Sequence, residues 1–428
     1  MQRRHFLGLC AVGLPAAGWL LRPSDAGAAY SSEFASWNEQ LRLHGEGRPR
    51  MLLDLNAVDH NLALVLANLG SQDSRKHLRL VVKSLPSIEL LEYLMRAAQT
   101  ERLMVFDLPR LQVITEALPQ VDVLMGKPMP VAAVAAYYDG HDSGFDPARQ
   151  LQWLVDSPQR LQEYLALAKA RDLRLSINIE LDVGLRRGGV TAGTVLDEML
   201  SVIQAHPKHL VWSGFMGYDA HVVKVPDLIA DTSTLFRQAM QAYNAAVAQL
   251  KQDFPSLTQN LAADRPCLNT AGSPTFRLHQ QETLCNEVAV GSGIVQPTDF
   301  DIPSLEGHRP ACFIASPVLK QLGALELPGN QQLGALWARW DVNQRRRYFI
   351  YGGDWKAKYY QPAGLQPNPL YGRSTNQDLV CSSPATALNV GDHVFLRPTQ
   401  SERVLAQFGD LFICRGSTHL DQWTTMRV

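Results

Sequence analysis

Short apolar runs alternate with amphipathic segments along most of this chain, from Met51 to about Pro303. Strand followed by helix, repeated about eight times over roughly 250 residues, is typical of a closed parallel (β/α)8 barrel. A doubly wound open sheet is the competing topology. The strand-like runs lie at 78–82, 103–105, 121–125, 151–155, 173–179, 210–215 and 287–295, and the helix-like segments include 88–97, 158–170, 194–205 and 228–250.

The pattern changes after Pro310, where helical periodicity is absent and Gly, Pro and Asn separate strand-sized runs. We predict a separate C-terminal β domain there, and a long loop at residues 353–380. The strand-sized runs of this region lie at 312–315, 334–340, 347–350 and 393–396. The expected organisation is a signal peptide at 1–28, an N-terminal extension at 29–50, a barrel at 51–305 and a β domain at 306–428.

The first residues resemble an export signal. Arg3 and Arg4 precede an apolar segment that ends at Leu21, followed by the small residues Ala26-Gly27-Ala28. Because the segment is shorter than the roughly 20 residues that span a bilayer, we expect a cleaved twin-arginine signal and a periplasmic mature protein. An uncleaved membrane anchor is the alternative. The twin-arginine route exports folded proteins, so the signal fits an enzyme with a bound cofactor.

The charge and the cysteine content of the chain exclude few classes of function. The chain has 40 basic and 41 acidic residues, so nothing in it indicates nucleic acid or an anionic membrane as a partner. Beyond the predicted signal, the cysteines are odd in number and include no CxxC pair, so at most two disulfides can form. They are Cys267, Cys285, Cys312, Cys381 and Cys414.

Lys83 directly follows the apolar run Leu80-Val81-Val82. A cation after a buried strand places an amine at the carboxyl end of a barrel, where the active sites of this fold collect. A desolvated lysine can lose its proton near neutral pH and form a Schiff base with a carbonyl, as the lysine of pyridoxal phosphate enzymes does. An exposed residue that ends a strand is the other interpretation of Lys83 alone.

Two further motifs follow predicted strands. In the first, Glu180 and Asp182 alternate along a strand end and share a face, and Gly184 and Gly189 flank an arginine pair. An arginine there can contact a phenolate or a carboxylate, although a charged loop that closes a strand fits equally well. The second motif is 213–221, in which Tyr218 and His221 are candidates for an acid, a base or a ring-positioning group.

Small residues gather in two late clusters, 269–275 and 291–293. Backbone amides of Gly-rich turns, together with serine and threonine hydroxyls, can bind phosphate without a lysine. Each cluster alone is an ordinary turn. Their shared position late in a barrel is more informative, because phosphate sites of barrels often form there.

In this order, the motifs resemble those of D-threonine aldolase and D-serine dehydratase-like proteins. That family consists of pyridoxal phosphate enzymes with an alanine-racemase-like barrel and a C-terminal β domain, and the similarity extends from about Met51 to Gly416. The motifs are the run from Leu53 to Leu62, Lys83 after a strand, Glu180-x-Asp182-x-Gly184-x-x-Arg187-x-Gly189, Gly217-Tyr218-Asp219-Ala220-His221, Gly272-Ser273-Pro274-Thr275 and Glu287-x-x-x-Gly291-Ser292.

The resemblance implies a role for each matching residue. Lys83 is expected to hold the cofactor as a Schiff base, with Arg187 near the phenolic oxygen of the cofactor. Tyr218 and His221 are expected to line the ring and the substrate. The residues implied around the phosphate are Ser273, Thr275, Gly291 and Ser292. The resemblance also implies a homodimer.

The chain departs from the family at its C-terminal metal site. Family members carry Pro-x-His-x-Cys or Pro-x-His-x-Asp there, whereas this chain has Pro398-Thr399-Gln400-Ser401-Glu402. The expected Glu-Glu-His element is also replaced, by Asn376-Gln377-Asp378. Gln400, Glu402 and Asp378 can form an all-oxygen site, which favours Mg or Mn over Zn. The alternative is that no metal binds and these residues make hydrogen bonds.

The expected function is that of an exported pyridoxal phosphate-dependent enzyme acting on a small amino acid. The resemblance favours a lyase, either an aldolase or a dehydratase, of D-configured β-hydroxy amino acids. The altered metal residues keep two alternatives open. One is an amino-acid racemase of the same fold, and the other is a non-catalytic protein that binds pyridoxal phosphate.

Overall fold

The computed structural model describes residues 22–70, 76–140, 144–226, 228–259, 266–280, 283–368 and 370–426. Most of the predicted export signal therefore lies outside the described residues. The chain divides into two compact units. The first contains 53–312, 399–413 and 421–428, and the second contains 1–52, 313–398 and 414–420. In the described part of the chain, no helix is long and apolar enough to cross a membrane.

The first unit contains a closed barrel of eight parallel strands, which confirms the predicted fold and excludes an open sheet. Closure occurs between the last and the first strand, where Glu287 pairs with His77 and Val290 with Leu80. The strands are β2 (His77–Val81), β3 (Arg102–Val105), β4 (Asp122–Met125), β5 (Leu151–Val155), β6 (Leu175–Glu180), β7 (Leu210–Gly217), β8 (Cys267–Thr270) and β9 (Glu287–Val290).

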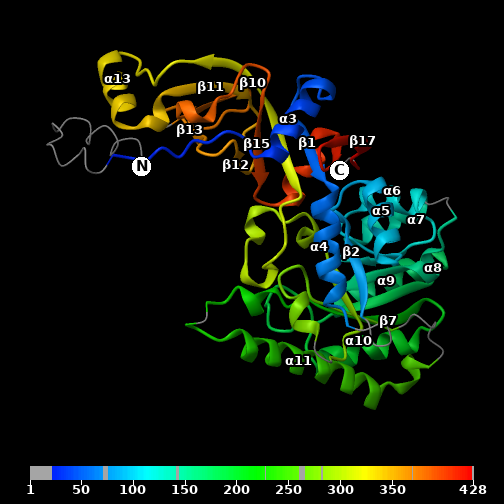
Figure 1. Cartoon of the computed structure of the whole chain (residues 1–428). Helices are drawn as coiled ribbons and strands as arrows, with labels where there is room; N and C mark the ends of the chain where they lie inside the picture. The colour runs from blue at the N-terminus through cyan, green and yellow to red at the C-terminus, as the bar shows by residue number, and fades with distance from the viewer. Residues whose placement is uncertain are drawn as a thin grey trace. The chain divides into compact units, whose positions relative to one another are not determined.

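An α-helix lies between most successive strands in the sequence, whereas the described residues between β8 and β9 contain only the 3-10 helix Phe276–Gln280. Figure 1 shows helices α5 to α11 around strands β2 and β7. Side-chain caps fix where several begin: Ser87, Asp107 and Ser157 each accept a hydrogen bond from an amide in the first turn, an interaction worth about 1 kcal/mol. The helix expected at 228–250 begins only at Thr232, because the side chain of Asp231 caps it by accepting a hydrogen bond from the amide of Thr234. The helices are α4 (Leu55–Ala67), α5 (Ile88–Ala98), α6 (Leu108–Ala117), α7 (Val131–Gly140), α8 (Pro147–Gln150), α9 (Pro158–Arg171), α10 (Thr194–Ala205), α11 (Thr232–Asp253) and α12 (Ser292–Val295).

Buried charges occupy the barrel near the amino ends of its strands. The guanidinium of Arg79 is fully buried and lies 2.9 Å from Oε2 of Glu287 and 2.6 Å from Oδ1 of Asp122. Glu287 is also fully buried, pairs with Arg102 at 3.1 Å and accepts a hydrogen bond from Asn269 at 2.7 Å. Each of these four charged side chains has a partner of opposite charge, which offsets the cost of burying them.

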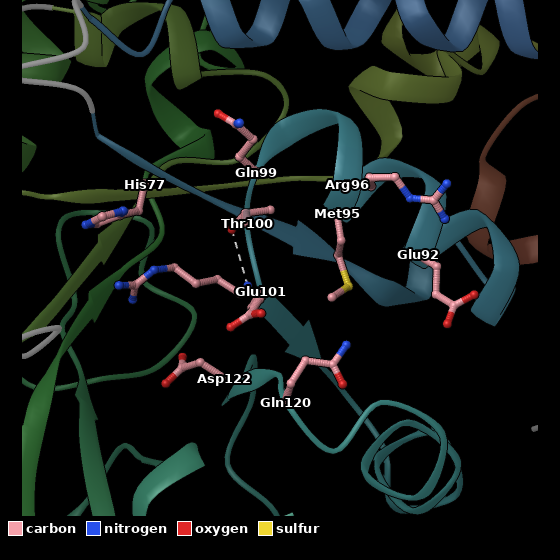
Figure 2. Close-up of a pocket in the computed structure, with 10 residues that line it drawn as sticks. His77, Glu92, Met95, Arg96, Gln99, Thr100, Glu101, Gln120 and Asp122 are labelled. Atoms are coloured by element: carbon pink, nitrogen blue, oxygen red, sulfur yellow. Dashed lines mark hydrogen bonds between the residues drawn. The ribbon is translucent and has the colours of Figure 1, made fainter.

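An open cavity of about 670 Å³ adjoins these charges (Figure 2). Figure 2 shows Glu92, Met95 and Arg96 of helix α5 on one side of the cavity. His77 and Asp122, the first residues of strands β2 and β4, also line it. The cavity therefore lies at the amino ends of the strands, opposite to Lys83. In barrels this end serves stability, whereas active sites form at the other end.

The second unit contains most of a nine-stranded sheet. Aromatic rings of helix α3 (Ser32–His44) pack on it: the ring of Phe34 lies 5.0 Å from that of Phe313 and 4.9 Å from that of Phe395. The N-terminal extension is therefore part of this unit. The strands of the sheet are β1 (Arg50–Asp54), β10 (Cys312–Leu322), β11 (Arg346–Tyr351), β12 (Ala357–Gln361), β13 (Gln366–Pro367), β14 (Gln377–Ser382), β15 (His393–Pro398), β16 (Asp410–Arg415) and β17 (Thr418–Thr424).

Two predictions for the C-terminal region are wrong. The run at 334–340 belongs to helix α13 (Gln331–Trp340), which Asn330 caps by accepting a hydrogen bond from the amide of Leu333. The segment 353–380 is not one loop, because strand β12 pairs with β15, Ala357 opposite Pro398. The partner of β12 is distant in sequence, so composition alone gave no indication of that strand.

Candidate active site

A cavity of about 130 Å³ lies at the carboxyl ends of the barrel strands, within the first unit. Most of the predicted cofactor residues line it. Lys83 comes from the turn after β2, Tyr218 from the end of β7, and the two small-residue clusters from the ends of β8 and β9. The predicted residues that line it are Lys83, Arg187, Tyr218, Ser273, Gly291 and Ser292.

Lys83 lies in the 3-10 turn Val82–Ser84 that ends strand β2, as its place in the sequence predicts. Its side chain is 41% exposed, so the amine is accessible from the cavity. The amine lies 4.7 Å from the centroid of the Phe106 ring and 3.6 Å from Oε1 of Glu402. This arrangement places the amine of Lys83 at the mouth of the barrel, beside the carboxylate of Glu402.

Arg187 projects from a tight loop after strand β6. A parallel bridge between Leu181 and Val190 closes the loop, and Gly189 has φ +91°, where a Cβ would lie 2.8 Å from backbone atoms. Asp182 accepts hydrogen bonds from two amides of the loop, so its carboxylate shapes the backbone. The Arg187 guanidinium lies 4.9 Å from the centroid of the Tyr218 ring, a cation–π contact.

Tyr218 and His221 have different surroundings, although they are close in sequence. Burial raises the pKa of Tyr218, and Arg187 opposes the shift only in part, so the phenol keeps its proton at neutral pH. Burial lowers the pKa of His221, which packs against Gly184 and is not among the described residues that line the cavity. The structure therefore brings Tyr218, but not His221, to the cavity wall.

The small-residue clusters form a cradle of hydroxyl and amide groups. Ser273 Oγ accepts hydrogen bonds from the amides of Gly291 and Gly293 at 3.3 and 2.9 Å. Ser292 Oγ lies 2.9 Å from Ser84 Oγ. A Cβ at Gly291 would lie 2.7 Å from Val81, so only glycine allows this close approach of β9 to β2.

Thr275 has a structural partner that local sequence patterns did not reveal. Its hydroxyl is fully buried, donates to Oδ1 of Asp219 at 2.5 Å and accepts from the amide of Gly272. The other oxygen of Asp219 lies 2.7 Å from Nε2 of His279, and both side chains are fully buried. Asp219 thus joins the turn that carries Tyr218 to the loop that carries Ser273. His279 is 60 residues away, so no local spacing indicated the pair.

The three predicted metal ligands have other partners. Glu402 accepts hydrogen bonds from Ser84 and Ser292, and the amide of Gln400 donates to Asp299 at 2.9 Å. Asp378 belongs to the other unit, where Arg373 lies 2.6 Å from it. Among the described residues, no group of three or more His, Cys, Asp and Glu side chains is arranged to hold a metal ion. These contacts are those of the alternative in which no metal binds, and the all-oxygen metal site is not tested.

Comparison with known proteins identifies the barrel. Residues 53–298, more than half of the chain, match the alanine racemase N-terminal domain. The chain belongs to this family. The search of curated proteins found no match to this chain.

Solved structures share the fold over most of their length. D-threonine aldolase from Filomicrobium marinum is 15% identical, with 88% of this chain and 96% of that chain covered and a TM-score of 0.66. D-threo-3-hydroxyaspartate dehydratase from Delftia sp. HT23 is 16% identical, with coverages of 89% and 97% and a TM-score of 0.64. Alanine racemase from Bacillus anthracis is 14% identical, with coverages of 88% and 97% and a TM-score of 0.65.

The alanine racemase-like family implies pyridoxal phosphate as cofactor, and the cavity fits this group. Lys83 places an amine and Arg187 a cation on the wall of this cavity. The cradle of Ser273, Gly291 and Ser292 is suited to phosphate. Glu402, which also lines the cavity, does not suit a phosphate group. Its carboxylate accepts a hydrogen bond from Ser292 of the cradle, and its negative charge repels phosphate.

Proposed function

We propose that this protein is an exported, homodimeric, pyridoxal phosphate-dependent enzyme that acts on a small amino acid, as a lyase of D-configured β-hydroxy amino acids. One observation carries the proposal. The amine of Lys83, the Arg187–Tyr218 pair and the serine–glycine cradle line a single cavity at the carboxyl end of the barrel. An amine, a cation and a phosphate cradle are the groups that this cofactor requires.

The residues of the chain have distinct roles in this proposal. When bound, the cofactor supplies a ring that takes up the electron pair left at the Cα atom of the substrate. Lys83 holds the cofactor and accepts or returns a proton at Cα, while Arg187 faces the ring. Tyr218 keeps its proton because burial raises its pKa, so in the lyase reaction it is suited to donate a proton.

The shared fold with D-threonine aldolase and D-threo-3-hydroxyaspartate dehydratase supports a lyase. A racemase is the second candidate, since the chain matches the alanine racemase N-terminal domain and lacks the histidine and cysteine of the metal site. Racemisation needs only acid and base groups on the two sides of Cα, and Lys83 and Tyr218 are candidates for these. It therefore does not depend on a cation at a β-hydroxyl.

Substrate turnover separates these candidates. The protein, loaded with pyridoxal phosphate, is incubated with D-threonine, D-serine and D-alanine. A lyase cleaves the carbon chain or releases ammonia from the β-hydroxy substrates, and its products are measured by chromatography. Inversion without a change in composition identifies a racemase. A stable complex with the cofactor that converts none of these substrates contradicts the enzyme proposal and supports a non-catalytic binding protein.

We expect catalytic activity to persist after exhaustive chelation. The reason is that Glu402, Gln400 and Asp378 already have hydrogen-bond or ion-pair partners in the protein. Turnover is measured after dialysis against a chelator, with and without added Mn or Mg. Loss of activity on chelation that Mn or Mg restores, together with inactivity of Glu402→Ala, would contradict this expectation and re-establish the predicted all-oxygen cation site.

Export is tested by replacing the paired arginines. We expect the double variant Arg3→Lys, Arg4→Lys to remain in the cytoplasm as precursor, because the twin-arginine route requires the pair. Cell fractionation detects the precursor, and N-terminal sequencing of exported protein is expected to begin at about Ala29. Arg22→Lys, in the same segment but after the apolar run, serves as the control. Unimpaired export of the double variant would indicate the general secretory route.

A further inference from the structure

The carboxylate of Glu402 lies where the cradle hydroxyls converge. Its Oε1 accepts hydrogen bonds from Ser84 Oγ at 3.1 Å and from Ser292 Oγ at 3.3 Å, and its Oε2 accepts one from Ser401 Oγ at 3.3 Å. The Nζ atom of Lys83 lies 3.6 Å from the same Oε1. All these groups belong to the first unit.

Three serine hydroxyls and one amine make a strong oxyanion site. Ser84, Ser292 and Ser401 are 1%, 4% and 0% exposed, so water does not compete well for their protons. Hydrogen bonds to a charged acceptor are shorter and stronger than those the hydroxyls can make to one another, such as Ser84 to Ser292 at 2.9 Å. An anion at this point is therefore favourable, and in the described structure the anion is a side chain of the protein itself.

One of these hydroxyls, that of Ser292, belongs to the cradle that the proposed function assigns to the cofactor phosphate. Ser292 lines the cavity beside Ser273 and Gly291, and Ser84 is the residue after Lys83. With Glu402 in place the cavity measures about 130 Å³, below the roughly 300–1,000 Å³ that is usual for ligand sites. The Glu402 side chain is 26% exposed, so it has a path towards solvent.

We propose that Glu402 is an internal competitor for the phosphate end of the cofactor. Its carboxylate accepts from Ser292 Oγ and has to move away before a phosphate group uses that hydroxyl, because two oxyanions repel each other and compete for the same donor. This inference rests on the proposed function. It makes the binding of phosphorylated cofactor weaker than the cradle alone allows, whereas a vitamer without phosphate does not meet this competition.

The test compares cofactor-free protein with Glu402→Gln, which keeps the size of the side chain and removes its charge. Dissociation constants for pyridoxal phosphate and for pyridoxal are measured by absorbance titration. We expect Glu402→Gln to bind pyridoxal phosphate at least tenfold more tightly and pyridoxal within twofold of the parent. Glu306→Gln, at an exposed glutamate of the same unit, serves as the control and is expected to match the parent. Unchanged or weaker binding of pyridoxal phosphate by Glu402→Gln overturns the inference.

Inorganic phosphate tests the inference separately from the proposed function. Because a ligand that binds the folded state stabilises it, the rise in melting temperature with phosphate concentration reports occupancy of the cradle. We expect phosphate to raise the melting temperature of Glu402→Gln and of Glu402→Ala more than that of the parent. If neither parent nor variants bind pyridoxal phosphate, the proposed function fails, whereas a phosphate difference still shows that Glu402 competes with a phosphate group. An equal response of parent and variants contradicts the inference.

Discussion

Glu287→Ala is expected to destabilise the barrel by about 3–5 kcal/mol, the cost of removing one partner from a buried ion pair. Glu287 is fully buried and pairs with Arg79 and Arg102. Without it, the guanidinium of Arg79 stays buried with a single carboxylate, that of Asp122. The free energy of unfolding is measured from urea denaturation at neutral pH.

An exposed glutamate at the same end of the barrel is the control for Glu287→Ala. Glu101→Gln, at an exposed glutamate that lines the cavity in Figure 2, is expected to change the free energy of unfolding by less than about 0.5 kcal/mol.

The stabilisation by Glu287 is also expected to depend on pH. Burial tends to raise the pKa of Glu287, but Arg79 and Arg102 outweigh it and hold the pKa below its usual value. The stabilisation is therefore present above the unfolded-state pKa, about 4.3, and is lost as the pH falls through the folded-state pKa. If Glu287→Ala lowers the free energy of unfolding by less than about 1 kcal/mol, the buried charges contribute little to the stability of the barrel.

Lys83→Ala is expected to abolish the covalent link to the cofactor and to lower kcat on the order of 10³-fold or more, as removal of a covalent catalyst does. Its side chain is 41% exposed, so the free energy of unfolding is expected to change by less than about 0.5 kcal/mol. Activity, the visible absorption spectrum and urea denaturation are measured on the same preparation. Lys127→Ala, at an exposed lysine shortly after strand β4, is the matched control. Full turnover by Lys83→Ala would contradict the role of this residue.

The barrel could be predicted because its signals are local. Strands buried on both faces appear as continuous apolar runs, and helices between them appear as amphipathic segments with polar caps such as Ser157. The position of Lys83 followed from the same rule, since the residue after a barrel strand lies at the carboxyl end. The helix α13 was missed because its short apolar run, 334–340, fits a strand as well as a helix.

The remaining features depend on partners that are distant in sequence. Arg79 interrupts the apolar strand β2, and only the closed barrel shows that Glu287 neutralises it. Asp219 and His279 meet because the turns after β7 and β8 are neighbours. Glu402 was predicted as a metal ligand from its place in the family motif, whereas its contacts with Ser84 and Ser292 require the folded chain. Periodicity carries no information on such pairs.

The central claim, that Lys83 carries pyridoxal phosphate, is tested most directly by locating the attached cofactor. The protein is loaded with pyridoxal phosphate, reduced with borohydride, digested and examined by mass spectrometry. We predict one phosphopyridoxyl group, on the peptide that contains Lys83, and none at Lys127. Absence of the group from Lys83, or its attachment mainly to another lysine, would contradict the account.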